Sequence, residues 1–87
     1  MKAVVVTAKG DSSVLDARNI DAPEISSDSQ VLVKIAAAGM NPIDTKVRAG
    51  NLFNAEFPFI PGCDGCGTVI ETGSAVTGFR PGDMVWY

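Results

Sequence analysis

The sequence contains no histidine and only two cysteines, Cys63 and Cys66. A structural zinc site takes four ligands, usually cysteine or histidine in two pairs, so these side chains supply half of a set. Two cysteines separated by two residues are also too few and too close together to crosslink a small secreted fold. We therefore expect reduced thiols and no metal held by this chain alone.

Strong charge and long hydrophobic runs are also missing. Seven Lys and Arg residues and ten Asp and Glu residues give a net charge of −3, without the basic run that binding to a nucleic-acid backbone requires. No apolar run reaches the roughly 18 to 20 residues of a membrane span, and the apolar block in MKAVVVTAKG is too short for a signal peptide. We expect a soluble, cytoplasmic protein with neither nucleic acid nor membrane as a partner.

Short β-branched runs separated by turn residues predict a mainly β fold. Strands are expected at residues 2–8 and, with looser alternation, at residues 14–20. In QVLVKIAAAGM, the residues Val31, Val33 and Ile35 share one face at a period of two, which predicts a half-buried strand. Another strand is expected in GTVIETG and the start of a last one in MVWY, with a turn-rich connection and a Pro-Gly corner between them.

The segment NPIDTKVRAG predicts one short helix of about two turns. Asn41 can cap it, Pro42 suits the first helical position, and Gly50 can end it in a left-handed conformation. The aromatic, proline-marked segment NLFNAEFPFIPG follows. It predicts an irregular loop that covers apolar surface.

The stretch IPGCDGCGTVIETG holds two cysteines and several glycines just before a predicted strand. A redox C-x-x-C pair needs a helix N-terminus to lower the pKa of a thiol, but strand-forming residues follow here. A dinucleotide loop has the order G-x-G-x-x-G before a helix, and these glycines have the reverse spacing before a strand. The favoured interpretation is a tight turn whose glycines allow positive φ or close backbone approach and whose thiols pack.

The order of these pieces resembles the medium-chain dehydrogenase/reductase superfamily, and more narrowly its zinc-independent quinone oxidoreductase branch, related to zeta-crystallin. The resemblance covers nearly the whole chain and rests on the motifs N-P-x-D-x-x-x-R-x-G, P-G-x-D-x-x-G-x-V and G-D-x-V. It implies a GroES-like, partly open β-barrel at the N-terminus of a longer enzyme. Residues 1–87 would then be a truncated substrate-side domain, with the nucleotide-binding Rossmann domain absent from this chain and placed beyond Tyr87.

Zinc-dependent alcohol dehydrogenases of that superfamily differ from this chain at four positions. Asn41 stands where they place a cysteine ligand, and Cys63 followed by Asp64 stands in place of His-Glu. Ile43 occupies the position of a hydroxyl that relays a proton in those enzymes. A thiolate and an amide are a poor set of ligands for a Lewis-acid zinc, so the resemblance implies chemistry without catalytic zinc.

The resemblance implies a parent enzyme that binds NADPH, mainly through the absent domain, and passes its hydride to a quinone or an α,β-unsaturated carbonyl. Such acceptors are electron-poor and need no metal. The parent would be a homodimer, and the isolated 87 residues would be inactive. Two alternatives stay open: a non-catalytic GroES-like binding or assembly module, and a relative of the zinc-dependent alcohol dehydrogenases.

Asn41 is the predicted catalytic residue. Its amide can donate to a carbonyl oxygen that gains negative charge, or orient the nicotinamide carboxamide, or do no more than cap the helix. Lys46 follows one turn later, where relatives carry an aromatic residue that lines the cofactor site. It could meet a cofactor phosphate or simply point to solvent.

Asp44 and Arg48 are spaced as i and i+4, which predicts a local ion pair, and relatives use the equivalent aspartate to brace the site from behind. Phe53, Phe57 and Phe59 of the aromatic loop are predicted to cover the acceptor pocket, since flat apolar walls suit quinones, and Cys63 is predicted to face the same pocket. The aromatic residues could equally form a clamp over the open barrel. Cys63 has no neighbouring histidine or cationic cluster to activate it, so we do not expect it to act as a nucleophile.

Overall fold

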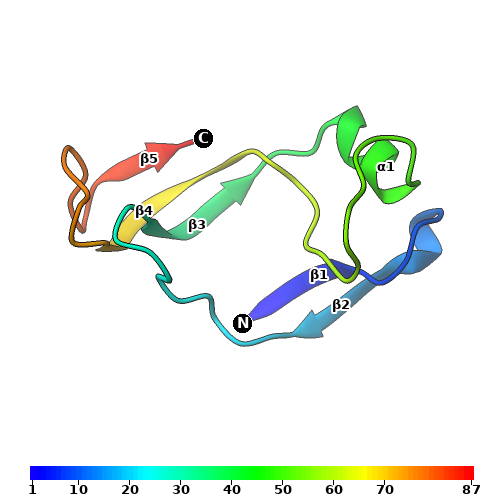
Figure 1. Cartoon of the computed structure of the whole chain (residues 1–87), viewed down its shortest axis with the longest axis horizontal. Coiled ribbons are helices and arrows are strands. Elements are labelled where there is room, and N and C mark those ends of the chain that lie inside the picture. Colours follow the sequence, from blue (N-terminus) through cyan, green and yellow to red (C-terminus); the bar gives the residue numbers. More distant parts are fainter. The chain divides into compact units, whose positions relative to one another are not determined.

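The computed structural model describes residues 1–87 and contains two small antiparallel sheets and one short helix (Figure 1). One sheet has the order β1-β2 and the other the order β3-β4-β5, and neither closes into a barrel. The strands are β1 (Lys2–Val6), β2 (Leu15–Asn19), β3 (Val31–Ala38), β4 (Gly65–Thr72) and β5 (Met84–Trp86). The predicted mainly β fold with one short helix is confirmed.

The chain divides into two compact units. Unit 1 comprises residues 1–21 and 40–63, and unit 2 comprises residues 22–39 and 64–87. Unit 1 holds the β1-β2 sheet and the helix, whereas unit 2 holds the β3-β4-β5 sheet.

In unit 1, β1 supplies the core. Val5 and Val6 are 6% and 0% exposed, while every residue of β2 is exposed. The first strand ends two residues earlier than expected, and a 3₁₀ turn, η1 (Ser12–Val14), delays the second strand to Leu15. Asp11 caps this turn, because its carboxylate accepts a hydrogen bond from the Ser13 N–H at 2.9 Å.

The helix α1 (Pro42–Arg48) has the predicted position and length. Asn41 is its N-cap residue, and the Asp44 carboxylate returns to accept a hydrogen bond from the Asn41 backbone N–H at 2.9 Å, as in a capping box. Gly50 follows the helix with φ +80°, the left-handed conformation expected of it. With seven residues, α1 is far too short to cross a bilayer.

In unit 2, the predicted one-sided burial of β3 is wrong at Ile35. Val31, Leu32 and Val33 are all half-buried, whereas Ile35 is 46% exposed. The β3-β4 register shifts between Leu32 and Val33 and again between Ile35 and Ala37. Because a β-bulge adds a residue to one strand, it breaks the period of two on which the prediction depended.

The glycine-rich turn behaves as the favoured interpretation requires. Gly62 has φ +104°, and a Cβ added at Gly67 would lie 2.0 Å from the Lys34 carbonyl oxygen. Cys66 is half-buried in β4, but Cys63 is exposed, so only one of the two thiols packs. Both are free thiols, and the segment runs into a strand without an intervening helix.

The connection before β5 also has the expected corner. The Asp83 N–H donates to the Arg80 carbonyl at 3.1 Å, and Gly82 has φ +98°. Proline followed by a positive-φ glycine is typical of a type II turn.

Candidate functional site

Unit 1 contains a cavity of about 230 Å³ between α1 and the loop that follows it. The helix supplies one wall and the loop from Phe53 to Cys63 supplies the other. Most of the lining is aliphatic or aromatic. The complete lining is Ile43, Asp44, Val47, Phe53, Phe59, Ile60, Pro61, Gly62 and Cys63.

Both walls of this cavity are fixed to β1 or to the turn behind it. On the loop side, Val6 donates to the Phe59 carbonyl at 2.8 Å and Phe59 donates to the Val6 carbonyl at 3.2 Å. On the helix side, the Gly10 N–H donates to the Arg48 carbonyl at 3.0 Å, and the Arg48 Nε donates to the Gly10 carbonyl at 3.2 Å. The cavity is thus held by hydrogen bonds of its own unit.

Three of the predicted site residues line this cavity together: Asp44, Phe53 and Cys63. Phe57 does not line it. The Phe57 ring instead contacts the ring of Phe59, with centroids 5.5 Å apart and planes tilted by 48°. Phe59, which belongs to the same predicted aromatic loop, does line the cavity.

The sequence interpretation also missed two apolar residues of the helix wall, Ile43 and Val47. Their spacing of i and i+4 places them on one face of a helix, so the signal was present in the sequence. It was hidden by the shortness of the helix, which offers too few residues for a clear period of 3.6.

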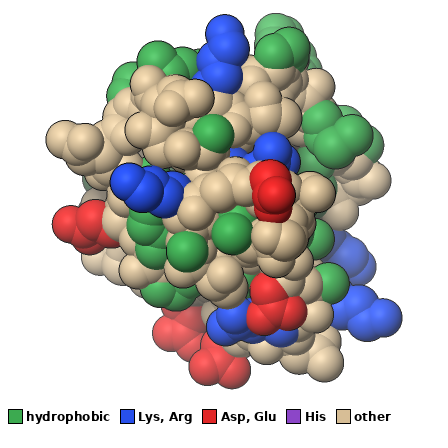
Figure 2. Space-filling model, turned by 90° about the vertical axis from the view of Figure 1, so that its right-hand side faces the viewer, with side chains coloured by type: hydrophobic (Ala, Val, Ile, Leu, Met, Phe, Trp, Pro, Cys, Tyr) green, Lys and Arg blue, Asp and Glu red, His purple; other side chains and the backbone are tan.

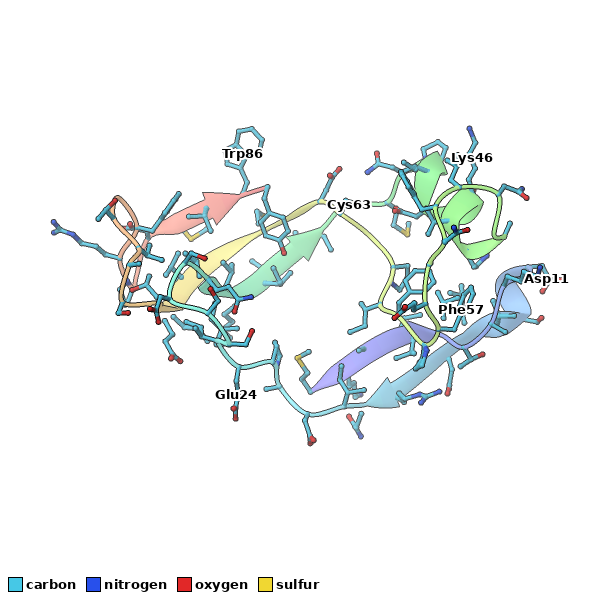
Figure 3. The ribbon with its side chains drawn as sticks, in the orientation of Figure 1. Asp11, Glu24, Lys46, Phe57, Cys63 and Trp86 are labelled. Atoms are coloured by element: carbon cyan, nitrogen blue, oxygen red, sulfur yellow. The ribbon has the colours of Figure 1, made fainter.

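Asn41 and Lys46 are exposed, and neither lines the cavity. Asn41 lies at the start of α1, where its backbone is held by Asp44. In Figure 3 the Lys46 side chain extends outward from α1, away from the loop that carries Phe57. The orientation toward solvent is the one the structure shows for Lys46.

The predicted ion pair between Asp44 and Arg48 is wrong. The Asp44 carboxylate bonds to the Asn41 N–H, and the Arg48 guanidinium bonds to the Gly10 carbonyl. The one salt bridge of the chain lies elsewhere, between Arg18 and Asp16. The Asp44 side chain thus turns back to cap the first turn of α1, whereas the Arg48 side chain bonds to Gly10 and anchors the last turn.

The electrostatics of this unit are modest. The pKa of Asp11 is lowered by hydrogen bonds from the Ser13 hydroxyl and the Ser13 N–H, and to a smaller degree by the positive charge of Arg48. Figure 2 shows both basic and acidic side chains at the surface of the chain.

The donors of this chain do not fit a zinc ion. No three side chains of His, Cys, Asp or Glu come together as metal ligands would. The positions that resemble the zinc-ligand positions of alcohol dehydrogenases carry Asn41 and Cys63, one amide and one thiol. This set offers too few thiolate, imidazole or carboxylate groups for a tetrahedral site.

The comparisons with known proteins agree with the fold. The family described as alcohol dehydrogenase GroES-like domain matches residues 27–87. The chain is 43% identical to a chloroplastic NADPH-dependent alkenal/one oxidoreductase of Arabidopsis thaliana, over 99% of this chain and 23% of the relative.

Two solved structures show the same likeness. The quinone oxidoreductase of Coxiella burnetii has a TM-score of 0.88 and 38% identity, with 99% of this chain and 28% of that one covered. The Escherichia coli quinone oxidoreductase in complex with NADPH has a TM-score of 0.92 and 29% identity, with 100% and 26% covered. The chain therefore spans about a quarter of the length of these relatives. It belongs to the alcohol dehydrogenase GroES-like domain family, and the relatives it matches include quinone oxidoreductases.

Proposed function

We propose that residues 1–87 form the acceptor-side domain of an NADPH-dependent oxidoreductase that reduces quinones or α,β-unsaturated carbonyls. The observation that carries this proposal is the apolar cavity between α1 and the loop of residues 53–63, in a chain whose relatives include quinone and alkenal oxidoreductases. In this proposal, the nucleotide-binding domain belongs to the part of the protein outside residues 1–87. The cytoplasmic location and the homodimer stay predictions.

The residues of this chain fit an acceptor better than they fit a whole dinucleotide. A cavity of about 230 Å³ is smaller than the roughly 300 to 1,000 Å³ of a typical ligand site, and the sequence has no G-x-G-x-x-G segment. The bound cofactor would supply the hydride, and this domain would supply the surface on which the acceptor rests. Lys46 is exposed and does not line the cavity, so its ammonium group could approach a cofactor phosphate.

The cavity walls suit a flat, electron-poor ring. Phe53 and Phe59 offer aromatic faces, and Ile43 and Val47 offer aliphatic contact from the helix. Such walls would give the ring of the acceptor apolar contact, and the oxygen that gains negative charge would need a polar interaction from a residue at the edge of the cavity. We assign that polar interaction to Asn41, whose side-chain amide can donate to the acceptor oxygen or orient the nicotinamide carboxamide.

The first test follows NADPH oxidation by the natural polypeptide that contains these residues. A simple para-quinone and a short conjugated enal are the acceptors, and a saturated aldehyde of the same length is the matched control. We expect consumption of NADPH with the first two and none with the control, since a conjugated system spreads the charge left by the hydride, whereas a saturated carbonyl concentrates it on an oxygen that needs a Lewis acid or a general acid. Absence of turnover with every electron-poor acceptor would refute the proposal.

The role of Asn41 is tested by Asn41→Ser. Serine is as good an N-cap residue as asparagine, so α1 should keep its start, but its hydroxyl is too short to replace the amide. We expect kcat to fall on the order of 10²-fold, the usual loss for one donor to a developing oxyanion. Unchanged kcat in a variant with an intact helix would show that Asn41 is only a cap.

A further inference from the structure

We propose that the unit 1 cavity binds the uncharged, apolar part of the acceptor, and that the Asp44 carboxylate makes it select against anionic acceptors. The inference rests on the proposed function and deepens it by naming the class of acceptor. It rests on two observations: one carboxylate lines the cavity, and no Lys or Arg side chain does.

Asp44 is the only Asp, Glu, Lys or Arg side chain in the lining. It is half-buried, and its neighbours in the wall are the aliphatic side chains of Ile43 and Val47. A carboxylate at an apolar wall is poorly screened by water, so its field acts on whatever enters the cavity. A neutral ring meets mostly apolar contacts there, whereas a second anion meets a like charge.

No cation forms a salt bridge with this carboxylate. Arg48 lies one turn away on the same helix, but its guanidinium donates to the Gly10 carbonyl and forms no salt bridge with Asp44. Lys46 is exposed and absent from the lining. The bond that Asp44 does make is to the neutral N–H of Asn41, which orients the carboxylate without removing its charge.

The size of the expected effect follows from Coulomb's law. Two like charges about 6 Å apart at a half-exposed site, with an effective dielectric constant of about 40, repel enough to change an equilibrium about tenfold. We therefore expect kcat/KM for a neutral acceptor to exceed kcat/KM for an anionic acceptor of the same shape. The charge of Asp44 should account for about a factor of ten in the ratio of these two values.

The experiment uses two 1,4-quinones that carry the same short alkyl chain, which ends in a methyl ester in one and in a carboxylate in the other. The ring is the same in both, so their reduction potentials are closely matched. The ratio of their kcat/KM values is measured for the natural polypeptide and for Asp44→Asn. We expect the substitution to lower the ester-to-acid ratio about tenfold, because asparagine can still accept the Asn41 N–H but carries no charge.

Two variants separate charge from structure. Asp44→Glu keeps the charge and should keep a high ratio even where kcat falls. Asp11→Asn removes a carboxylate of the same unit that does not line the cavity, and it should leave the ratio as it is. Added salt should reduce the ratio for the natural protein and should have little effect on Asp44→Asn.

An unchanged ratio in Asp44→Asn, or an equal loss in Asp11→Asn, would overturn the inference while leaving the proposed function in place. Failure to reduce either quinone would instead refute the proposed function. In that case calorimetric binding of the ester and the acid to the natural protein and to Asp44→Asn still decides the inference. The inference would be overturned if the ratio of the affinity for the ester to the affinity for the acid were the same in the natural protein and in Asp44→Asn.

Discussion

Gly67→Ala should damage the β3-β4 pairing, because there is no room for a methyl group where the two backbones meet. A Cβ at this position would lie 2.0 Å from the Lys34 carbonyl oxygen and 2.9 Å from the Ile35 Cα. Side chains can rotate away from such a contact, but a paired backbone cannot. The strands must therefore separate by about 1 Å before the oxygen reaches the 3.0 Å that real Cβ atoms keep.

A separation of that size stretches the hydrogen bonds on either side of the contact. Two ladder bonds at about 0.5 to 1.5 kcal/mol each give about 1 to 3 kcal/mol, which agrees with the usual cost of overpacking a core. At 1.4 kcal/mol per factor of ten, a loss of about 2 kcal/mol corresponds to a roughly 30-fold larger equilibrium constant for opening, and so to roughly 30-fold faster hydrogen exchange. Hydrogen exchange, read by mass spectrometry on peptides from residues 31–38 and 65–72 of the natural polypeptide, measures this opening directly.

Gly65→Ala is the matched control, since it lies on the same strand two residues away. There the nearest atom to a new Cβ is the Tyr87 hydroxyl at 2.7 Å, at the far end of a side chain that can move. We expect its effect on exchange in β3 to be several-fold smaller. Equal protection in the two variants would refute the argument that backbone approach, and not simply a strand glycine, sets the requirement at Gly67.

Two further predictions concern the turn that anchors the helix. Arg48→Met removes the Nε bond to the Gly10 carbonyl and should lower the free energy of unfolding by about 0.5 to 1.5 kcal/mol in urea titrations, whereas Lys46→Met, an exposed change on the same helix, should cost less. The pKa of Asp11 is lowered from 3.8 in the folded state, so its charge stabilises the fold above that pH, and the contribution is lost as the pH falls through the folded pKa. Asp11→Asn should therefore flatten the loss of stability below about pH 4, and an unchanged pH profile would contradict this assignment.

The elements of the fold could be predicted because their signals are local. Asn41, Pro42 and Gly50 mark the beginning and end of α1, and each takes the conformation that its chemistry favours. The face of β3 could not be predicted in the same way. The register shift after Ile35 depends on how β4 pairs with it, and pairing is a property of two segments that lie far apart in the sequence.

The same distinction between local signals and contacts with distant residues applies to the candidate site. Asp44, Phe53 and Cys63 were placed in one cavity on the strength of motifs. Phe57 and Phe59 were both expected to cover this pocket, but only Phe59 lines the cavity. Phe59 is fixed by the backbone bridge to Val6, and the sequence near the two phenylalanines gives no sign of that bridge. The Asp44 to Arg48 pair failed for a related reason, because the Gly10 carbonyl competes for the arginine from 38 positions away.

The position of Ile43 connects the cavity to the chemistry proposed for it. In the alcohol dehydrogenases that this chain resembles, the corresponding position carries a hydroxyl that relays a proton, whereas here an isoleucine lines the wall. The side chain of Ile43 has no group that could accept the proton that an alcohol must lose. Under the proposed function, an electron-poor ring that gains a hydride would find apolar contact at the same point, so Ile43 would both disfavour alcohol oxidation and favour binding of a neutral conjugated acceptor.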